Sequence, residues 1–285
     1  MNVSTLPFPS LGEGPEDGEL VVLLHGFPQT KEAWRVVAAR LAGAGYQAVA
    51  FDQRGYRPEA DGGPCGSLRL EELAEDVHAV ANALGRARYH VVGHDWGGAV
   101  VWWLAARAPE RLLTATVVAT PHPRALARSV IGVQGLRSIY AAAFQVPALP
   151  EIVLRAGNGA LLRGFLQASG LDHVHAEGYT TAMLTDDVLH DALGWYRANR
   201  VTSIASVGPS AVPTLYVWPD GDVALGRRAA ERTADHVKAP YRFVVLEGAS
   251  HWVPESRPDE LADLIVDHLG SVPGRPSSRK ERSAS

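Results

Sequence analysis

The sequence has very little cysteine and no long apolar run. Cys65 is its only cysteine, which excludes an intrachain disulfide and a metal site built from several cysteines. No stretch reaches the roughly 18 apolar residues of a membrane helix. The segment Met1–Gly14 also has no basic region followed by an apolar one, the pattern of a secretion signal. We therefore expect a cytoplasmic protein without a membrane span.

The charges show no strong excess of one sign. The formal net charge is -4 and the pI is about 6.3, so no field of the whole molecule would attract nucleic acid or an anionic membrane. Neither is expected as a partner. Hydrophobic residues make up 46% of the chain and charged residues 20%, which is typical of a globular protein.

Short apolar runs alternate with longer segments of helical periodicity. Glu19–Gly26 is a continuous apolar run, typical of a strand buried on both faces. Lys31–Gly45 has apolar residues at i, i+3, i+4 and i+7 and ends in glycine, as a helix does. The same alternation continues through Gln47–Gly55, Leu68–Gly85, Tyr89–Gly93, Trp96–Arg107 and Leu112–Thr120. We therefore predict an α/β fold with a mostly parallel sheet and helices on both faces.

The alternation is interrupted once. From residue 122 to 208 the pattern is helical and irregular, and strands resume at Thr214–Trp218 and Tyr241–Gly248. We therefore expect a core formed by residues 1–121 and 209–271 with a helical block of residues 122–208 inserted into it. Residues 272–285 are polar and rich in Pro, Ser and Arg, and we expect a disordered tail there.

The stretch VVGHDWGGAVV combines a strand, a sharp turn and the start of a helix. Its frame, Gly-x-x-x-Gly, usually carries a serine nucleophile at the centre, but here the central residue is Asp95. At the carboxyl end of a strand, in front of a helix N-terminus, a carboxylate is favoured in its ionised form. An ionised carboxylate can attack carbon and form an ester intermediate. We expect Asp95 to be a nucleophile rather than a simple helix cap.

An ester intermediate needs a base that activates water. His251 follows the predicted strand Tyr241–Gly248 and would lie at the same edge of the sheet as Asp95. Histidine titrates near neutral pH and can take a proton from water. Asp220 and Asp222, after the strand Thr214–Trp218, could both orient it. The order nucleophile, acid, base along the chain is the order of α/β-hydrolases.

Two backbone N–H groups are candidates for an oxyanion hole. Phe27 follows the strand within the sequence HGFP, and Trp96 directly follows Asp95. Both would polarise the ester carbonyl during attack by water. His173 and His175 lack a plausible third ligand, so we expect no metal site, and the predicted chemistry requires no cofactor.

Together, HGFPQT, FDQRGY, GHDWGGAV, VPTLYVWPDGDVALG and EGASHWVPE resemble the epoxide hydrolase branch of the α/β-hydrolase family. The resemblance implies the α/β-hydrolase fold and a helical cap at the inserted block, and it favours Asp222 over Asp220 as the acid. It also implies two cap tyrosines that donate to the epoxide oxygen. Tyr140 is followed by Phe-Gln at the family's spacing, and Tyr196 lies in a Trp-Tyr-Arg sequence.

The resemblance thus implies an enzyme that opens a small hydrophobic epoxide with water to a vicinal diol. Two alternatives remain. A haloalkane dehalogenase shares the aspartate nucleophile and the following Trp96, although many such enzymes have Asn where this chain has Phe27. A non-catalytic ligand-binding protein on the same fold is the other alternative. An esterase is disfavoured because no serine stands at the position of Asp95.

Overall fold

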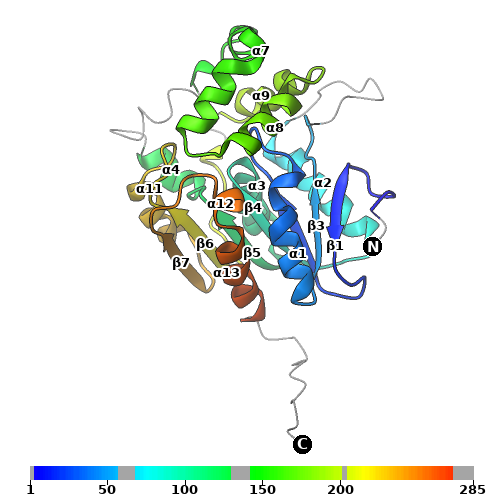
Figure 1. Ribbon diagram of the computed structural model, residues 1–285. Helices are drawn as coiled ribbons and strands as arrows, with labels where there is room; N and C mark the ends of the chain where they lie inside the picture. Colours follow the sequence, from blue (N-terminus) through cyan, green and yellow to red (C-terminus); the bar gives the residue numbers. More distant parts are fainter. Residues whose placement is uncertain (1–2, 57–67, 130–141, 201–203, 272–285) are drawn as a thin grey trace, which may run out of the picture.

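A single seven-stranded sheet forms the centre of the computed structural model, which describes residues 3–56, 68–129, 142–200 and 204–271 (Figure 1). Its order is β1-β3-β2-β4-β5-β6-β7, with β1 antiparallel to β3 and the other neighbours parallel. The strands are β1 (Ser10–Glu13), β2 (Leu20–Leu24), β3 (Gln47–Phe51), β4 (Tyr89–His94), β5 (Leu112–Val118), β6 (Thr214–Pro219) and β7 (Tyr241–Leu246). The predicted mostly parallel sheet is confirmed.

Helices cover both faces of this sheet. On one face α1 packs against α13, and on the other α2 packs against α3 (Figure 1). Strands β2, β3 and β4 are buried at every position, because a parallel strand covered on both faces has no solvent side. The helices and short 3-10 segments of the core are η1 (Lys31–Trp34), α1 (Arg35–Gly43), α2 (Leu70–Ala83), α3 (Trp96–Arg107), η2 (Pro109–Arg111), α4 (Pro123–Ser129), α11 (Arg227–Glu231), η4 (Arg232–His236), α12 (Val253–Ser256) and α13 (Pro258–Gly270).

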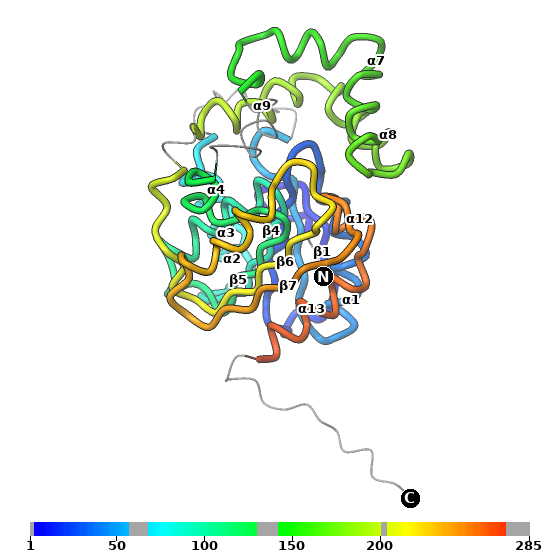
Figure 2. Tube along the Cα trace, turned by 90° about the vertical axis from the view of Figure 1, so that its left-hand side faces the viewer, coloured from blue at the N-terminus to red at the C-terminus, as the bar shows by residue number. Residues whose placement is uncertain are grey.

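Three further helices lie together at one end of the sheet (Figures 1 and 2). They are α7 (Leu149–Ala168), α8 (His173–Leu184) and α9 (Val188–Ala198), and α7 is kinked at residues 156–159. All three fall within the block 122–208, and we refer to them as the cap helices. Helix α4, at the start of that block, packs instead against α11 and η4, and the boundaries 122 and 208 stay a prediction.

Helix α9 and the residue after it are bonded to the part of the core between β3 and the start of α2. The indole N–H of Trp195 donates to the carbonyl oxygen of Arg54, at 2.9 Å. The Asn199 side chain donates to the carbonyl oxygen of Leu68, at 2.6 Å, and accepts from the backbone N–H of Leu70, at 3.0 Å. These bonds seat α9 on the connection that follows β3. No described helix is long and apolar enough to cross a membrane.

The turn between β4 and α3 brings the chain unusually close to β2. Asp95 has a φ of 51° and a ψ of -119°, a conformation that costs a non-glycine residue about 1–3 kcal/mol. A Cβ on Gly97 would lie 2.2 Å from the carbonyl oxygen of Leu24, so only glycine fits there. The side chain of Asp95 is thereby held above the end of the sheet.

Replacing Gly97 by alanine should therefore destabilise the protein strongly. The new methyl group meets backbone rather than a flexible side chain, so we expect Gly97→Ala to lower the free energy of unfolding by about 2–3 kcal/mol. Urea denaturation measures the change. Gly43→Ala is the matched control, since nothing lies within 4 Å of a Cβ at Gly43, and its stability should stay level or rise by up to about 1 kcal/mol. Equal stabilities of the two variants would contradict the close approach.

Candidate active site

The carboxylate of Asp95 lies between two loops at the end of the sheet. The backbone N–H of Phe27, in the loop after β2, donates to its Oδ1 at 3.0 Å, and the backbone N–H of Trp96 also donates to this carboxylate. A Cβ on Gly26 would lie 2.3 Å from the Cβ of Asp95. The lack of a side chain at Gly26 therefore allows the loop after β2 to approach Asp95 this closely. The two N–H groups that the sequence proposed for an oxyanion hole thus both contact the Asp95 carboxylate.

On the other side of Asp95 lies His251, in the loop after β7. Its Nε2 is 3.8 Å from Oδ2 of Asp95, and its Nδ1 is 2.8 Å from Oδ2 of Asp222. Oδ1 of Asp222 accepts from the backbone N–H groups of Ala224 and Leu225, at 2.7 and 3.0 Å. The structure thus brings Asp95, His251 and Asp222 together in one row.

The two acids after β6 differ in their contacts. The side chain of Asp222 is fully buried against His251. Asp220 is exposed, and its Oδ1 accepts from the backbone N–H of Gly248 at 2.7 Å. Asp220 therefore shapes the turn, and only Asp222 is placed to orient the histidine.

Burial and charge act in opposite directions on the ionisable groups. Burial alone would lower the pKa of His251, but the charge and the hydrogen bond of Asp222 outweigh it, and Asp95 and Glu255 add to them, so the pKa rises to about 9. Burial raises the pKa of Asp95, against the effects of His251 and of the N–H groups of Phe27 and Trp96. An imidazolium at His251 thus faces the carboxylate.

The backbone of Asp95 is held as well as its side chain. The hydroxyl of Thr120, just after β5, donates to the carbonyl oxygen of Asp95 at 2.6 Å, and the N–H of Ala99 donates to the same oxygen at 3.2 Å. These bonds oppose relaxation of the strained turn. Strain of this kind persists only where the surrounding structure enforces it.

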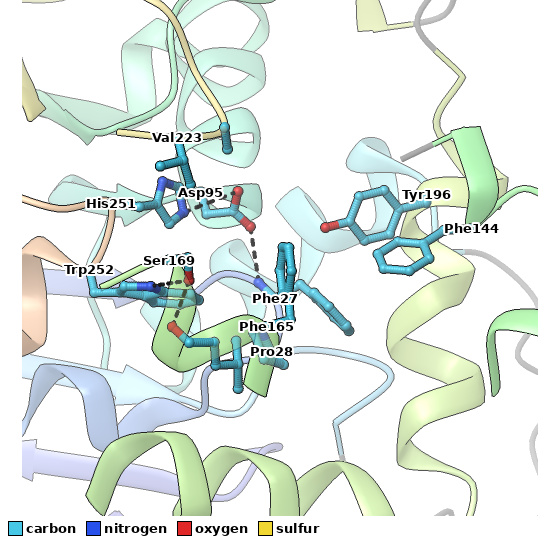
Figure 3. Close-up of a pocket in the computed structure, with 12 residues that line it drawn as sticks. Phe27, Pro28, Asp95, Phe144, Phe165, Ser169, Tyr196, Val223, His251 and Trp252 are labelled. Carbon is cyan, nitrogen blue, oxygen red and sulfur yellow. Dashed lines mark hydrogen bonds and ion pairs between the residues drawn. The ribbon is translucent and has the colours of Figure 1, made fainter. Parts of the chain in front are cut away.

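A largely apolar pocket opens above Asp95 (Figure 3). It has about 450 Å³ of open space, part of which is continuous with solvent. Core loops and cap helices both contribute to its wall, which is formed by Phe27, Pro28, Asp95, Phe144, Phe165, Leu166, Ser169, Tyr196, Val223, Ala224, His251 and Trp252. A concave, aromatic wall with few polar groups is typical of sites for small hydrophobic ligands.

Tyr196, on α9, faces Asp95 from the side of the pocket opposite His251 (Figure 3). Its ring is buried among Phe27, Phe144 and Trp96, with ring centroids 5.6, 5.0 and 5.0 Å away and edge-to-face geometry. Its carbonyl oxygen accepts from the side-chain amide of Gln145 at 2.5 Å. These contacts hold the hydroxyl towards the pocket.

The second predicted tyrosine, Tyr140, lies outside the described residues. The residues after it in the predicted motif, Phe144 and Gln145, are described and contact Tyr196. Among the described residues no group of three or more His, Cys, Asp or Glu side chains is arranged to hold a metal ion.

Several wall residues were not predicted from the sequence. Val223 and Trp252 are next to Asp222 and His251, so chain proximity could have indicated them. Phe165 and Ser169 lie on and just after α7, and no pattern in that helix distinguishes residues that face the pocket from residues that face solvent. The Ser169 hydroxyl accepts from the indole of Trp252 and donates to the carbonyl of Leu166.

Comparison with known proteins agrees with this arrangement. Residues 19–258 match the family described as the alpha/beta hydrolase fold. The AB hydrolase superfamily protein YfhM of Bacillus subtilis is 34% identical over 267 residues, covering 90% of this chain and 92% of that protein. Epoxide hydrolase A of Mycobacterium tuberculosis is 28% identical over 302 residues, covering 90% and 92%.

A solved structure is similar over nearly the same length. The crystal structure of epoxide hydrolase A from Mycobacterium thermoresistibile has a TM-score of 0.77 and 26% sequence identity, and the match covers 93% of this chain and 95% of that one. The predicted resemblance to the epoxide hydrolase branch is confirmed by these relatives. The fold and the family match agree with each other. The chain belongs to the α/β-hydrolase family.

Proposed function

We propose that the protein is an epoxide hydrolase that converts a small hydrophobic epoxide and water to a vicinal diol. The observation that carries this proposal is the position of the Asp95 carboxylate, with His251 on one side and the Tyr196 hydroxyl on the other side of an apolar pocket. The names of the relatives in Mycobacterium tuberculosis and Mycobacterium thermoresistibile support it. We propose the cytoplasm as its location, from the sequence.

In the first half of the reaction Asp95 attacks an epoxide carbon. Its Oδ1 is held by the N–H of Phe27, so Oδ2 is the oxygen that forms the new bond to carbon. The bond between that carbon and the epoxide oxygen breaks, and its electron pair goes to the oxygen. Tyr196 donates a proton to this oxygen, and Tyr140 is proposed as a second donor. A phenol can perform this step because an alkoxide is too basic to leave unprotonated near neutral pH.

In the second half His251 activates water. Conversion of Asp95 to an ester removes the negative charge that helped to raise the pKa of His251, so the imidazolium gives up its proton to solvent more easily after alkylation than before. The Tyr196 phenolate regains a proton from solvent. His251 then takes a proton from water, whose oxygen attacks the ester carbonyl. Negative charge develops on Oδ1, where the N–H group of Phe27 stabilises it, and the N–H group of Trp96, which also bonds this carboxyl group, is the proposed second donor. The bond between the carbonyl carbon and Oδ2 then breaks, Oδ2 takes the proton held by His251, and the diol leaves. The new carboxylic acid of Asp95 gives its proton to His251, which restores the starting state.

A haloalkane dehalogenase would use the same Asp95 and His251, and a ligand-binding protein would use the pocket alone. The Tyr196 hydroxyl favours the epoxide, since a halide leaves without a proton. Halide release from haloalkanes is therefore the appropriate comparison assay. Binding without turnover of either substrate class would support the non-catalytic alternative.

Isotope labelling tests the covalent intermediate. A single turnover in H₂¹⁸O should place the label in Asp95 and leave the first diol unlabelled, because water attacks the ester carbonyl and the diol takes Oδ2. Mass spectrometry of the diol and of the peptide that contains Asp95 measures both. A panel of aryl and alkyl epoxides supplies the substrate, with Asp95→Ala as the inactive control. Label in the first diol would show direct attack by water and contradict the scheme.

Removal of the Tyr196 hydroxyl should affect the ring-opening step. We expect Tyr196→Phe to lower the rate of alkylation by about 10²- to 10⁴-fold, because a general acid contributes on this scale. Pre-steady-state kinetics measures the rate. Tyr241→Phe is the matched control, since the Tyr241 hydroxyl is buried without a hydrogen-bond partner in the described structure and is remote in the fold on β7. Unchanged epoxide opening in Tyr196→Phe, together with halide release from haloalkanes, would favour a dehalogenase.

Loss of the Asp222 charge should stop the reaction at the ester. Asp222→Asn removes the main group that raises the pKa of His251, so this pKa should fall below about 9 and hydrolysis should slow by about 10²- to 10⁴-fold. The ester then accumulates, visible as an added substrate mass on the intact protein. Asp220→Asn, two residues earlier, should show no accumulation. The reverse result for the two variants would contradict the assignment of the acid.

A further inference from the structure

A chain of buried hydrogen bonds lies beside the proposed catalytic groups and connects a cap helix to the core. The hydroxyl of Tyr179, on α8, donates to Oε1 of Glu255 at 2.7 Å. The side-chain amide of Gln29 donates to the same oxygen at 2.6 Å. One carboxylate oxygen therefore joins the cap helix to two positions of the core.

The two core positions belong to the loops that flank Asp95. Gln29 directly follows the loop that carries the Phe27 N–H, and its Oε1 accepts from the backbone N–H of Gly26 at 2.9 Å. Glu255 lies on α12, which begins two residues after His251. The bond between Gln29 and Glu255 thus links the loop after β2, which contains Phe27, to the segment that follows His251. It therefore limits the distance between these two segments.

His94 adds a second connection between these loops. Its Nδ1 lies 2.7 Å from Oε1 of Gln29, and its Nε2 lies 2.9 Å from the carbonyl oxygen of His251. Because the amide nitrogen of Gln29 faces Glu255 and its oxygen accepts from Gly26, the Gln29 oxygen also faces His94 Nδ1. The His94 ring therefore lies between two acceptor oxygens, one of Gln29 and one of His251. The orientation of Gln29, and with it the contact to His94, therefore depends on Glu255.

Burial of the Glu255 carboxylate at this position has an unfavourable desolvation free energy. Oε2 of Glu255 is buried without a hydrogen-bond partner in the described structure. Burial raises the pKa of Glu255, and the bonds from Tyr179 and Gln29 only oppose this rise. A leucine of similar volume would avoid the desolvation cost. Packing and stability therefore do not explain why a carboxylate stands here. Its role as the shared acceptor for the donors of Tyr179 and Gln29 does explain it.

We propose that Glu255 is a positioning residue that sets the separation of the Phe27 N–H and His251 around Asp95. Through Tyr179 this separation depends on how the cap helix α8 sits on the core. A substrate that fits under the cap then stabilises the arrangement in which donor and base are both in place. The consequence for catalysis rests on the proposed function, but the hydrogen-bond arrangement can be measured without turnover.

Four variants of the full chain test the proposal. Glu255→Gln keeps an oxygen that can accept both bonds, and we expect kcat within about threefold of the parent protein. Glu255→Leu keeps the volume and removes the acceptor, and a misplaced catalytic group should lower kcat by about 10- to 100-fold. Tyr179→Phe removes only the bond from the cap, and we expect KM to rise by up to about tenfold with little change in kcat. Tyr241→Phe should change neither.

An NMR measurement gives a readout that needs no substrate. The ring N–H proton of His94 is buried between the oxygens of Gln29 and His251, so we expect a separate downfield signal, which should shift or disappear in Gln29→Leu. The signal should persist in Glu255→Gln and disappear or shift in Glu255→Leu. Should Glu255→Leu fail to fold, Gln29→Leu breaks the same bridge and should show the same loss of kcat.

The outcomes separate this proposal from the proposed function. If the parent protein opens no epoxide, the proposed function fails, and the His94 signal in the two Glu255 variants still decides whether the bridge positions the loops. A Glu255→Leu variant with the parent's kcat and His94 signal would overturn the proposal. So would a variant that only loses thermal stability, because Glu255 would then have a structural role alone.

Discussion

A carboxylate has to stay ionised where burial disfavours its charge, and the arrangement of the site follows from this constraint. Burial raises the pKa of Asp95, while the imidazole of His251 and the N–H groups of Phe27 and Trp96 oppose the rise. Phe27 and His251 come from loops more than 200 residues apart in a chain of 285, after β2 and β7. A parallel sheet brings them together, because the carboxyl ends of its strands meet at one edge.

The turn that places Asp95 is strained, and contacts with the core keep it in this conformation. Asp95 has a strained backbone, and the close approach at Gly97 leaves no space for a side chain. The bond from Thr120 to the carbonyl oxygen of Asp95 ties the turn to the neighbouring strand. Because β4 and β5 are buried on both faces, the strands provide a rigid support against which the turn cannot relax.

The cap helices contribute to the site in two different ways. Tyr196, seated on the core through Trp195 and Asn199, presents a hydroxyl to the pocket that the core itself does not provide. Tyr179 donates to Glu255, and through this residue it is connected to the loops on both sides of Asp95. The cap is thus connected to the proposed chemistry both directly and through the core.

The sequence by itself determined the strand and helix order and the turn at Asp95, because apolar periodicity and turn composition act over a few neighbouring residues. It left Asp220 and Asp222 open until a family resemblance favoured one, and it indicated neither Phe165 in the pocket wall nor the bonds among Gln29, Glu255 and Tyr179. Only the tertiary structure decided these, since each depends on where segments distant in the chain cross and on which side chains face each other there.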